Sequence, residues 1–313
     1  MTAPGIEIVR SWRDLPAALR GASVALGNFD GLHHGHRQVV EAAVEAGRRL
    51  KTRAGVISFD PHPRRWFQPE AEPFRVMNPA QQARALAGQG VEILYLLPFD
   101  AGMARMSDEA FARDVLASGL RVRHVAAGFD VTFGKDRTGD GDVLRRYGDR
   151  FGFGVTIVPR MAGLDGVKYA STEARRAVAA AEPEKAAEML GRPFAIEGEV
   201  IRGDQRGRLL GFPTANVSLG DYVRPAFGVY AVRVNLADGR IRTGVANIGA
   251  RPTVGGTEPR LEVHIFDLDE DLYDQTIEVE LVSSIRPEQK FESLDALKAR
   301  IAKDAEEARR RLG

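Results

Sequence analysis

The feature that most constrains the fold is a change of pattern near residue 184. Before it, apolar runs of strand length alternate with helical stretches, which is typical of a parallel sheet covered by helices on both faces. After it, short β-rich segments are separated by turn formers such as Asp238-Gly239, and no long helix intervenes, which predicts an antiparallel barrel. The 313 residues are enough for two domains, expected at 1–183 and 184–313.

The expected elements follow from periodicity and capping residues. In the first half we expect strands at 23–27, 55–59, 91–97, 122–127 and 155–158. A helix is expected at about 34–50, and helix starts at Asn78-Pro79 and at Ser107. The barrel segments are expected at 195–201, 228–234, 241–245, 261–266 and 277–282. Ser293 opens a closing helix with one apolar face, which consists of Leu294, Leu297, Ile301 and Leu312.

Composition excludes several classes of protein. The chain contains no cysteine, which excludes disulfides, thiolate zinc sites and cysteine nucleophiles. A net charge of +1 with balanced signs gives no indication of a nucleic-acid partner. No apolar run approaches the length of a membrane span and no secretory signal opens the chain, so we expect a cytoplasmic protein without a membrane partner. The oligomeric state does not follow from the sequence.

A loop rich in glycine and histidine follows the first expected strand. It reads Gly-Asn-Phe-Asp-Gly-Leu-His-His-Gly-His over residues 27–36 and leads into the first helix. A helix N-terminus binds phosphate through its free N–H groups, and glycine lets the backbone approach a ligand. His33 and His36 are three residues apart, so both can face one ligand and stabilise charge on a phosphorus atom. The alternatives are a transition-metal site and a loop with surface histidines.

A second glycine-rich stretch lies in the barrel half. Residues 203–216 contain three glycines within nine residues and end in Pro-Thr-Ala-Asn. Such a loop can wrap its backbone around a phosphate chain. Thr214 and Asn216 offer neutral oxygens, which Mg²⁺ accepts together with phosphate oxygens and water. A turn-rich barrel loop without a ligand is the alternative.

Together these motifs resemble the bacterial bifunctional riboflavin kinase/FAD synthetases, from about residue 5 to 310. In the first half the resemblance rests on the His-x-Gly-His segment and on residues 58–63 and 128–135. In the second half it rests on the Pro-Thr-Ala-Asn stretch and on residues 244–253 and 261–265. It implies an α/β plus β fold: a Rossmann-like nucleotidyltransferase domain with a parallel sheet, then an antiparallel Greek-key β-barrel of the riboflavin kinase type with a closing helix.

The resemblance also implies two reactions that use ATP. Riboflavin becomes FMN in the barrel, and FMN then becomes FAD in the N-terminal domain, with Mg²⁺ as cofactor and only small-molecule partners. Glu262, His33 and His36 are implied as catalytic residues, and Thr214 and Asn216 as Mg²⁺ ligands. ATP or phosphate binding is implied for Asn28, Gly35, Ser171, Thr172, Arg175, Gly203, Gly207, Arg208 and Gly211. Flavin or nucleotide binding is implied for Asp60, Asp130, Asn247 and Arg286.

Three alternatives remain open. The family's polyphosphate-binding segment Ser-Ser-Thr-x-Ile-Arg reads Ala-Ser-Thr-Glu-Ala-Arg at 170–175. Ala170 removes a hydroxyl whose hydrogen bond would be worth roughly 0.5–1.5 kcal/mol, so a kinase with an impaired adenylyltransferase domain is one alternative. A non-catalytic flavin carrier is another, and an adenylyltransferase for a different phosphate is a third, although the attached barrel argues against it. Alternation places His264 on the strand face of Glu262, where we expect it to be structural.

Overall fold

The computed structural model describes residues 5–160, 170–202, 211–253 and 256–313. The chain forms two compact units. The sheet unit comprises Thr2–Ala71 and Pro79–Tyr169, and the barrel unit comprises Glu72–Asn78 and Ala170–Gly313. This division falls earlier than the expected boundary at 183/184, because helix α7 (Ser171–Ala179) packs against helix α8 (Pro183–Leu190), which in turn packs against barrel strands.

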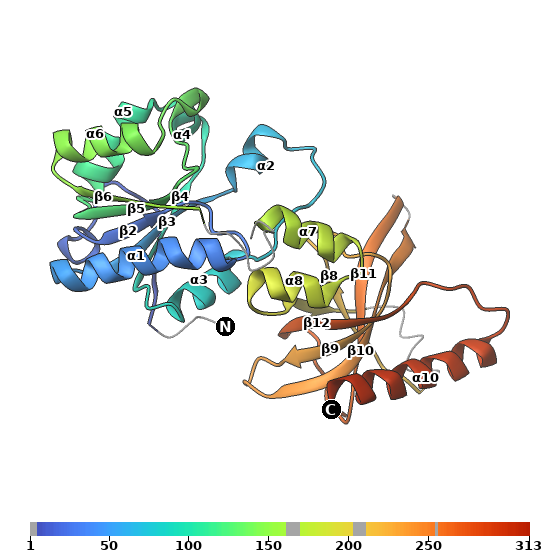
Figure 1. The fold of residues 1–313 in the computed structure, drawn as a ribbon. Helices are drawn as coiled ribbons and strands as arrows, with labels where there is room; N and C mark the ends of the chain where they lie inside the picture. The colour runs from blue at the N-terminus through green and yellow to red at the C-terminus, as the bar shows by residue number, and fades with distance from the viewer. Residues whose placement is uncertain (1–4, 161–169, 203–210, 254–255) are drawn as a thin grey trace. The chain divides into compact units, whose positions relative to one another are not determined.

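Six parallel strands form the sheet of the first unit (Figure 1). Their order is β1-β4-β3-β2-β5-β6, and the central strands are buried on both faces, as the continuous apolar runs predict. All of the strands expected in this half are present, and the short edge strand β1 is additional. The strands are β1 (Glu7–Val9), β2 (Ser23–Leu26), β3 (Ala54–Asp60), β4 (Ile93–Pro98), β5 (His124–Gly128) and β6 (Gly154–Val158).

Helices cover both faces of this sheet. Figure 1 shows α1 (His34–Leu50) and α3 (Pro79–Ala87) on one face, and α4 (Ala101–Arg105), α5 (Asp108–Ala110) and α6 (Gly141–Phe151) on the other. The short helix α2 (Pro63–Phe67) follows β3. A π-helical segment, Phe111–Gly119, continues α5, whose cap is the expected Ser107 side chain. Short 3-10 turns lie at Ala17–Leu19 and Lys135–Arg137.

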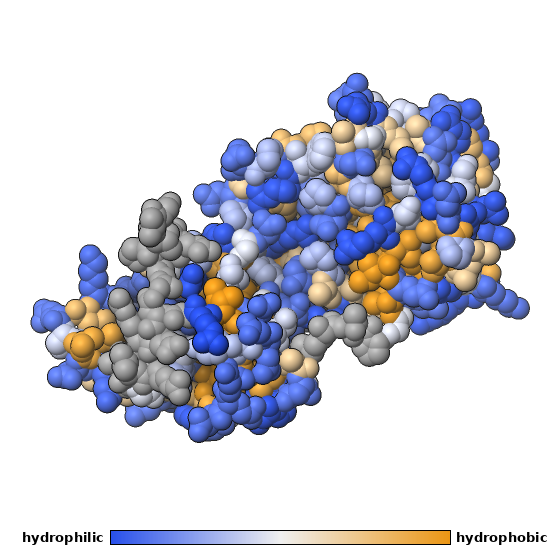
Figure 2. Space-filling view, turned by 180° about the vertical axis from the view of Figure 1, so that it is seen from behind, coloured by the Kyte–Doolittle hydropathy of each residue, from blue (hydrophilic) through white to orange (hydrophobic). Residues whose placement is uncertain are grey.

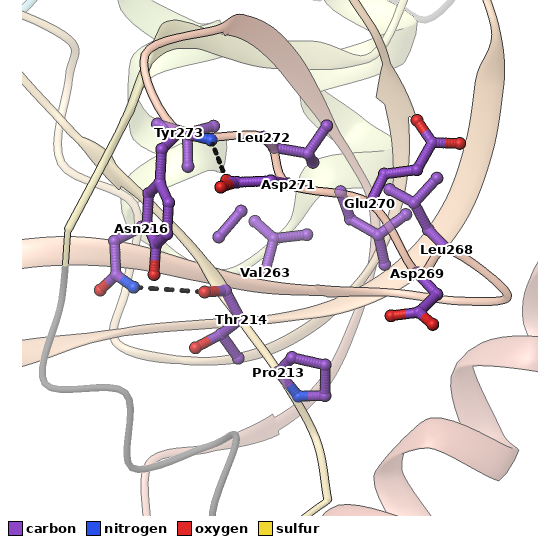
Figure 3. A pocket seen from close by; sticks show the side chains of 13 residues that line it. Pro213, Thr214, Asn216, Val263, Leu268, Asp269, Glu270, Asp271, Leu272 and Tyr273 are labelled. Atoms are coloured by element: carbon purple, nitrogen blue, oxygen red, sulfur yellow. Dashed lines mark hydrogen bonds between the residues drawn. The ribbon is translucent and has the colours of Figure 1, made fainter.

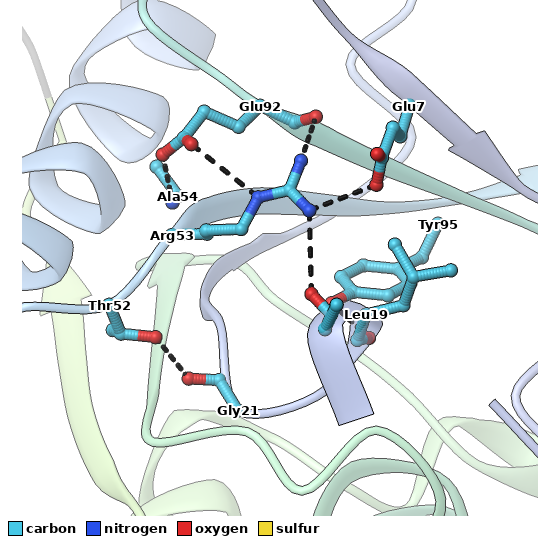
Figure 4. Close-up of polar contacts among 9 residues, drawn as sticks. Glu7, Leu19, Gly21, Thr52, Arg53, Ala54, Glu92 and Tyr95 are labelled. Atoms are coloured by element: carbon cyan, nitrogen blue, oxygen red, sulfur yellow. Dashed lines mark hydrogen bonds and ion pairs between the residues drawn. The ribbon is translucent and has the colours of Figure 1, made fainter. Parts of the chain in front are cut away.

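A polar network centred on Arg53 lies at the amino ends of these strands (Figure 4). The Arg53 guanidinium donates to Glu7 Oε2 at 2.9 Å and to the Glu92 carbonyl at 3.1 Å. The backbone N–H of Ala54 donates to Glu92 Oε1, and the Tyr95 hydroxyl donates to the Leu19 carbonyl at 2.9 Å. These contacts connect β1, β3 and β4 at the amino ends of the strands. The carboxyl ends of the strands lie on the opposite side of the sheet.

The second unit is a closed antiparallel barrel with the strand order β10-β11-β8-β7-β12-β9. All five of the expected barrel strands are present and longer than predicted, three of them by four residues or more. The strand β8, which the sequence did not predict, adds four residues directly after Thr214. The strands are β7 (Phe194–Ile201), β8 (Ala215–Ser218), β9 (Gly228–Asn235), β10 (Ile241–Thr253), β11 (Gly256–Ile265) and β12 (Thr276–Pro287).

A strap from the first half of the chain, residues 72–78, belongs to the barrel unit. The Arg75 N–H donates to the Asp221 carbonyl at 2.9 Å, and the Arg75 carbonyl accepts from the Val223 N–H at 2.8 Å. Asn78 Nδ2 donates to Glu197 Oε1 at 2.9 Å. Three apolar side chains of the strap are buried, namely Phe74, Val76 and Met77. The barrel unit is therefore discontinuous in sequence.

The closing helix α10 (Leu294–Leu312) begins at the expected Ser293, whose side chain accepts from the Ala296 N–H. Its packing face differs from the expected one. Leu294 is 70% exposed, whereas Asp304 and Ala308 are buried, and Leu312 packs beside Ala308 on the cluster of β9 and β10 residues. The expectation for Leu294 was wrong because the rotation of this helix is fixed by an ion pair between Asp304 and Arg286 of β12 and by the small side chain of Ala308.

The face of the molecule shown in Figure 2 is mostly hydrophilic, with apolar side chains gathered in a few small areas. Among the described residues, none of the helices combines the length and the apolar character that a membrane span requires.

Candidate functional site

The strand order of the sheet unit reverses direction at β2. From β2 the chain moves outward through β3 to β4, and it then returns to place β5 on the other side of β2. Parallel sheets bind ligands outside the carboxyl ends of their strands at such a reversal. The predicted loop 27–36 leaves β2 at this point and enters α1, so the structure places His33, His36, Asn28 and Gly35 at the expected position.

The loop between β2 and α1 has an unusual backbone. Phe29, Gly31 and Leu32 all have positive φ angles, of 50°, 84° and 44°. For Phe29 and Leu32 this conformation is strained, so surrounding contacts must hold it. Both side chains are only 2% exposed and act as apolar anchors. The strain lies next to the two histidines, which is where functional sites concentrate such conformations.

His33 and His36 face each other at the start of α1. His33 is the N-cap, and its Nδ1 accepts from the His36 backbone N–H at 3.3 Å. The two rings are stacked, with centroids 3.6 Å apart, and Phe29 contacts His36 edge-on at 5.3 Å. Because Nδ1 of His33 accepts a hydrogen bond, the neutral ring carries its proton on Nε2. The structure therefore brings both predicted histidines together as one pair.

A buried hydrogen-bond network that the sequence did not predict supports the backbone of this loop. The Asn28 carbonyl accepts from Gln82 Nε2 at 2.7 Å and from Ser58 Oγ at 3.1 Å. Ser58 and Gln82 are 2% and 7% exposed. Within the described part of the chain, Asn28 Oδ1 is buried and accepts no hydrogen bond. No local sequence signal connects Gln82 to this loop, because their contact depends on how α3 packs.

Asp60 and Asp130 follow the two strands that flank β2. Asp60 ends β3 and pairs with Arg10 at 3.7 Å. Asp130 comes two residues after β5 and is exposed, and its side chain folds back so that a Cβ on Gly128 would lie 3.3 Å from Asp130 Oδ1. Both residues therefore lie at the carboxyl ends of the strands, as the histidine pair does, and their assigned role stays a prediction.

Exposed aromatic side chains at the same edge were not predicted as site residues. Helix α2, which follows Asp60, carries Trp66 and Phe67, which are 39% and 64% exposed. Both rings contact Phe99 edge-on, at centroid distances of 6.4 and 5.8 Å. Exposed rings of this size are uncommon on a water-facing helix, and they provide an apolar surface for a planar ligand.

The predicted polyphosphate segment lies at the start of α7, in the barrel unit. Ala170 is the N-cap and provides no side-chain cap, and Ser171 and Thr172 are the first two helical residues. Arg175 Nε donates to the Phe74 carbonyl at 2.6 Å, and its guanidinium lies 5.5 Å from the Phe74 ring centroid. Arg175 therefore holds the strap, a contact that the sequence did not indicate.

Three predicted residues of the barrel form one row across neighbouring strands. Glu262 on β11 lies directly opposite Asn216 on β8 and directly opposite Asn247 on β10. Side chains paired in this way project to the same face with Cβ atoms about 4.5–5.5 Å apart. Glu262 is half-buried and Asn216 is 6% exposed. The structure therefore brings together a carboxylate and two amides that are far apart in sequence.

A pocket of about 310 Å³ borders this row (Figure 3). Thr214 and Asn216 line it on one side, and the loop 268–273 lines it on the other. Asn216 Nδ2 lies 3.5 Å from the Thr214 carbonyl, and Asp271 Oδ1 accepts from the Tyr273 N–H at 2.9 Å. The pocket thus adjoins the two residues predicted to bind Mg²⁺. The acidic loop that closes it was not predicted.

Two residues near the end of β12 complete the description of the barrel. Arg286 pairs with Asp304 of α10, and its flavin role stays a prediction. Glu288 lies over Gly249, where a Cβ would collide with its carboxylate and lie 3.1 Å from Asn247 Nδ2. A second carboxylate, missed by sequence reasoning, is therefore close to the row.

Gly211 is in the left-handed region that favours glycine, with φ 86°. Gly203, Gly207 and Arg208 lie outside the described residues.

Comparison with known proteins places both units among enzymes that transfer phosphate groups. The family model described as FAD synthetase matches residues 15–173, and the model described as riboflavin kinase matches residues 190–312. A bifunctional riboflavin kinase/FMN adenylyltransferase of Escherichia coli K12 is 40% identical over 309 residues and covers 98% of each chain. The relative of the same description from Pseudomonas fluorescens is 41% identical over 305 residues and covers 97% of each chain. The chain therefore belongs to the family of bifunctional riboflavin kinases/FMN adenylyltransferases.

A solved structure has the same fold over nearly the whole length. The crystal structure described as a macrolide-efflux protein from Streptococcus pneumoniae matches with a TM-score of 0.84 and 33% sequence identity. It covers 97% of this chain and 99% of that chain. The family and the two-part fold implied by the sequence motifs are thus confirmed.

Proposed function

We propose that the chain converts riboflavin to FMN in the barrel unit and FMN to FAD at the histidine pair, with one ATP used in each step. The observation that carries this proposal is that each unit matches its own family model and holds a polar site at the position of the family's motifs. Relatives that carry the bifunctional description span almost the whole chain. The use of ATP in both steps supports a cytoplasmic location as part of the same proposal.

In the kinase step, Glu262 accepts the proton of the riboflavin 5′-hydroxyl. The hydroxyl oxygen bonds to the γ-phosphorus of ATP while the bond from that phosphorus to the β,γ-bridging oxygen breaks, and ADP leaves. General-base assistance of this kind contributes about 10²–10⁴-fold. The pocket beside Thr214 and Asn216 offers a place for the nucleoside of ATP, and Asn247 lies beside Glu262 to orient the flavin substrate.

The side-chain oxygens of Thr214 and Asn216 are suitable ligands for Mg²⁺. The Asn216 amide nitrogen points to the Thr214 carbonyl, so Oδ1 is directed away from it. Neutral oxygens of this kind bind Mg²⁺ together with phosphate and water oxygens. When bound, Mg²⁺ neutralises charge that develops on the transferred phosphate.

In the adenylyltransferase step, a phosphate oxygen of FMN bonds to the α-phosphorus of ATP and pyrophosphate leaves. His33 donates from Nε2, and His36 lies against it, so both stabilise charge on the α-phosphate without a covalent intermediate. Trp66 and Phe67 provide an apolar surface for the flavin ring. The family motif assigns polyphosphate binding to Ser171, Thr172 and Arg175 at the start of α7.

The test is product analysis by chromatography with two crossed variants. The parent protein with riboflavin, ATP and Mg²⁺ should form FMN first and FAD later. Glu262→Gln should lose FMN formation but still convert supplied FMN to FAD. His36→Ala should still form FMN from riboflavin but lose the conversion of FMN to FAD. His33→Asn is a matched variant, because asparagine keeps an N-cap acceptor but removes the imidazole.

Each alternative predicts a different product pattern. FMN that accumulates without FAD, even when FMN is supplied, would favour the kinase with an impaired adenylyltransferase domain. Neither product, together with tight flavin binding, would favour the carrier. Full FMN production by Glu262→Gln would show that another group is the base.

A further inference from the structure

The side chain of His264 makes a contact that the kinase chemistry above does not use. Its Nδ1 lies 2.9 Å from the carbonyl oxygen of Pro213. A carbonyl only accepts hydrogen bonds, so His264 carries its proton on Nδ1 and donates. The ring contacts Phe212 edge-on at a centroid distance of 5.4 Å, and Phe266 at 5.8 Å. One imidazole thus contacts two successive residues of the segment that leads to Thr214.

The position of this contact gives it a specific role. The ladder between β8 and β11 ends at the pair Ala215–Val263. Thr214 follows Pro213 directly and lies just outside that ladder. His264, the next residue of β11, holds the carbonyl of Pro213 with its side chain and so extends the attachment beyond the last paired residue.

We infer that His264 is a positioning residue for the kinase: its Nδ1–H bond to Pro213 fixes the path of the chain at Thr214 and Asn216. Because His264 is two residues from Glu262 on the same strand face, one strand positions both the catalytic base and the segment that binds Mg·ATP. A displacement of about 1 Å of such a segment reduces catalysis far more than it reduces stability. The inference rests on the proposed role of Thr214 and Asn216.

The test compares two variants that differ only in where an amide N–H is placed. In His264→Asn, the amide nitrogen is attached to Cγ, as Nδ1 is in histidine, so it can still donate to Pro213. In His264→Gln, the amide nitrogen is one bond farther out. Both variants remove the ring contacts with Phe212 and Phe266, so their difference isolates the hydrogen bond.

We expect His264→Gln and His264→Ala to lower kinase kcat/KM about tenfold, in line with the loss of one well-placed hydrogen bond. The loss should appear as a higher KM for Mg·ATP with an unchanged KM for riboflavin. His264→Asn should recover most of it. FAD formation from supplied FMN should stay at the parent rate in all three, since none of the residues proposed for that reaction lies on β11 or in the segment that it holds.

A double variant supplies a readout that loss of folding would not give. If His264 acts through the Thr214 segment, then His264→Ala with Thr214→Val should lose less than the product of the two single losses. Equal kinase activity of His264→Asn and His264→Gln would overturn the inference. A fully active Thr214→Val would instead overturn the Mg·ATP assignment itself, with Thr214→Ser as the matched control.

Discussion

The guanidinium of Arg286 on β12 donates to both carboxylate oxygens of Asp304 on α10, with Nε–Oδ1 at 3.1 Å and Nη2–Oδ2 at 2.7 Å. The two side chains are 12% and 4% exposed. Arg300 Nε also donates to Oδ1, at 3.0 Å. The pair fixes how α10 lies against the barrel. A buried charge of this kind is costly when its partner is removed.

Asp304→Asn should therefore destabilise the barrel unit by about 3–5 kcal/mol, because it leaves the Arg286 charge buried without its counterion. The measurement is urea unfolding followed by circular dichroism and by loss of kinase activity. Tryptophan fluorescence gives an internal reference, since Trp12 and Trp66 both belong to the sheet unit.

The matched control is Asp267→Asn, which breaks the exposed two-bond pair with Arg309. Because that pair is in water, little change is expected. Equal effects of the two substitutions would contradict the importance assigned to burial.

His124 should make the stability of the sheet unit depend on pH. Burial, with a smaller contribution from the charge of Arg49, lowers the pKa of His124 below its ordinary 6.5. Below pH 6.5 the unfolded chain then binds more protons than the folded one, so stability is lost as the pH falls toward the folded-state pKa, by at most about 1.4 kcal/mol per pH unit.

This dependence can be measured by urea unfolding at pH 7.5 and 5.5 with tryptophan fluorescence. His124→Asn removes the titrating group next to Ser23 and Thr156, and it should show a smaller loss between the two pH values than the parent. If the loss is the same, another group carries the pH dependence.

Gln82→Met should slow FAD formation and leave FMN formation unchanged. The substitution removes the 2.7 Å bond to the Asn28 carbonyl, so the strained loop before the histidine pair loses a support. A loss of about threefold to tenfold is expected from one buried hydrogen bond. Gln89→Met, at an exposed position just after α3, is the control, and an equal effect there would refute the explanation.

Ala170→Ser should stabilise α7 by about 1 kcal/mol, because Ala170 is an N-cap without a capping side chain. With Glu173 at the third helical position, serine would also complete a capping box. If the hydroxyl serves only the helix, Ala170→Asp should give a similar gain in stability and a similar rate of FAD formation. If it also binds polyphosphate, serine should raise the rate and aspartate should lower it, which the chromatographic assay distinguishes.

Local patterns were enough to predict most of the fold. Helix α1 spans the predicted residues because its start is fixed by the loop with His33 and its apolar spacing persists to Leu50. The row of Glu262, Asn216 and Asn247 could not be derived from local spacing, because it depends on the register of three strands. The motif resemblance nevertheless identified each of its members.

Other features depend on packing between distant segments. The face of α10 was predicted from its leucines, but the buried Asp304 decides it, since an aspartate reads as a surface residue until its partner Arg286 is known. Gln82 has no sequence signal beyond its place in the helix expected to start at Asn78-Pro79. Its contact with Asn28 is a consequence of tertiary structure, as is the contact of Arg175 with Phe74.

The strap of residues 72–78 has a consequence for synthesis on the ribosome. Its backbone partners Asp221 and Val223 are translated roughly 150 residues later, which at about 5–20 residues per second is on the order of ten seconds. During that interval Phe74, Val76 and Met77 have no barrel to bury them. The first half of the chain therefore leaves the ribosome with an apolar segment that only the second half can cover, and a nascent chain that stalls before β9 would present that segment to chaperones.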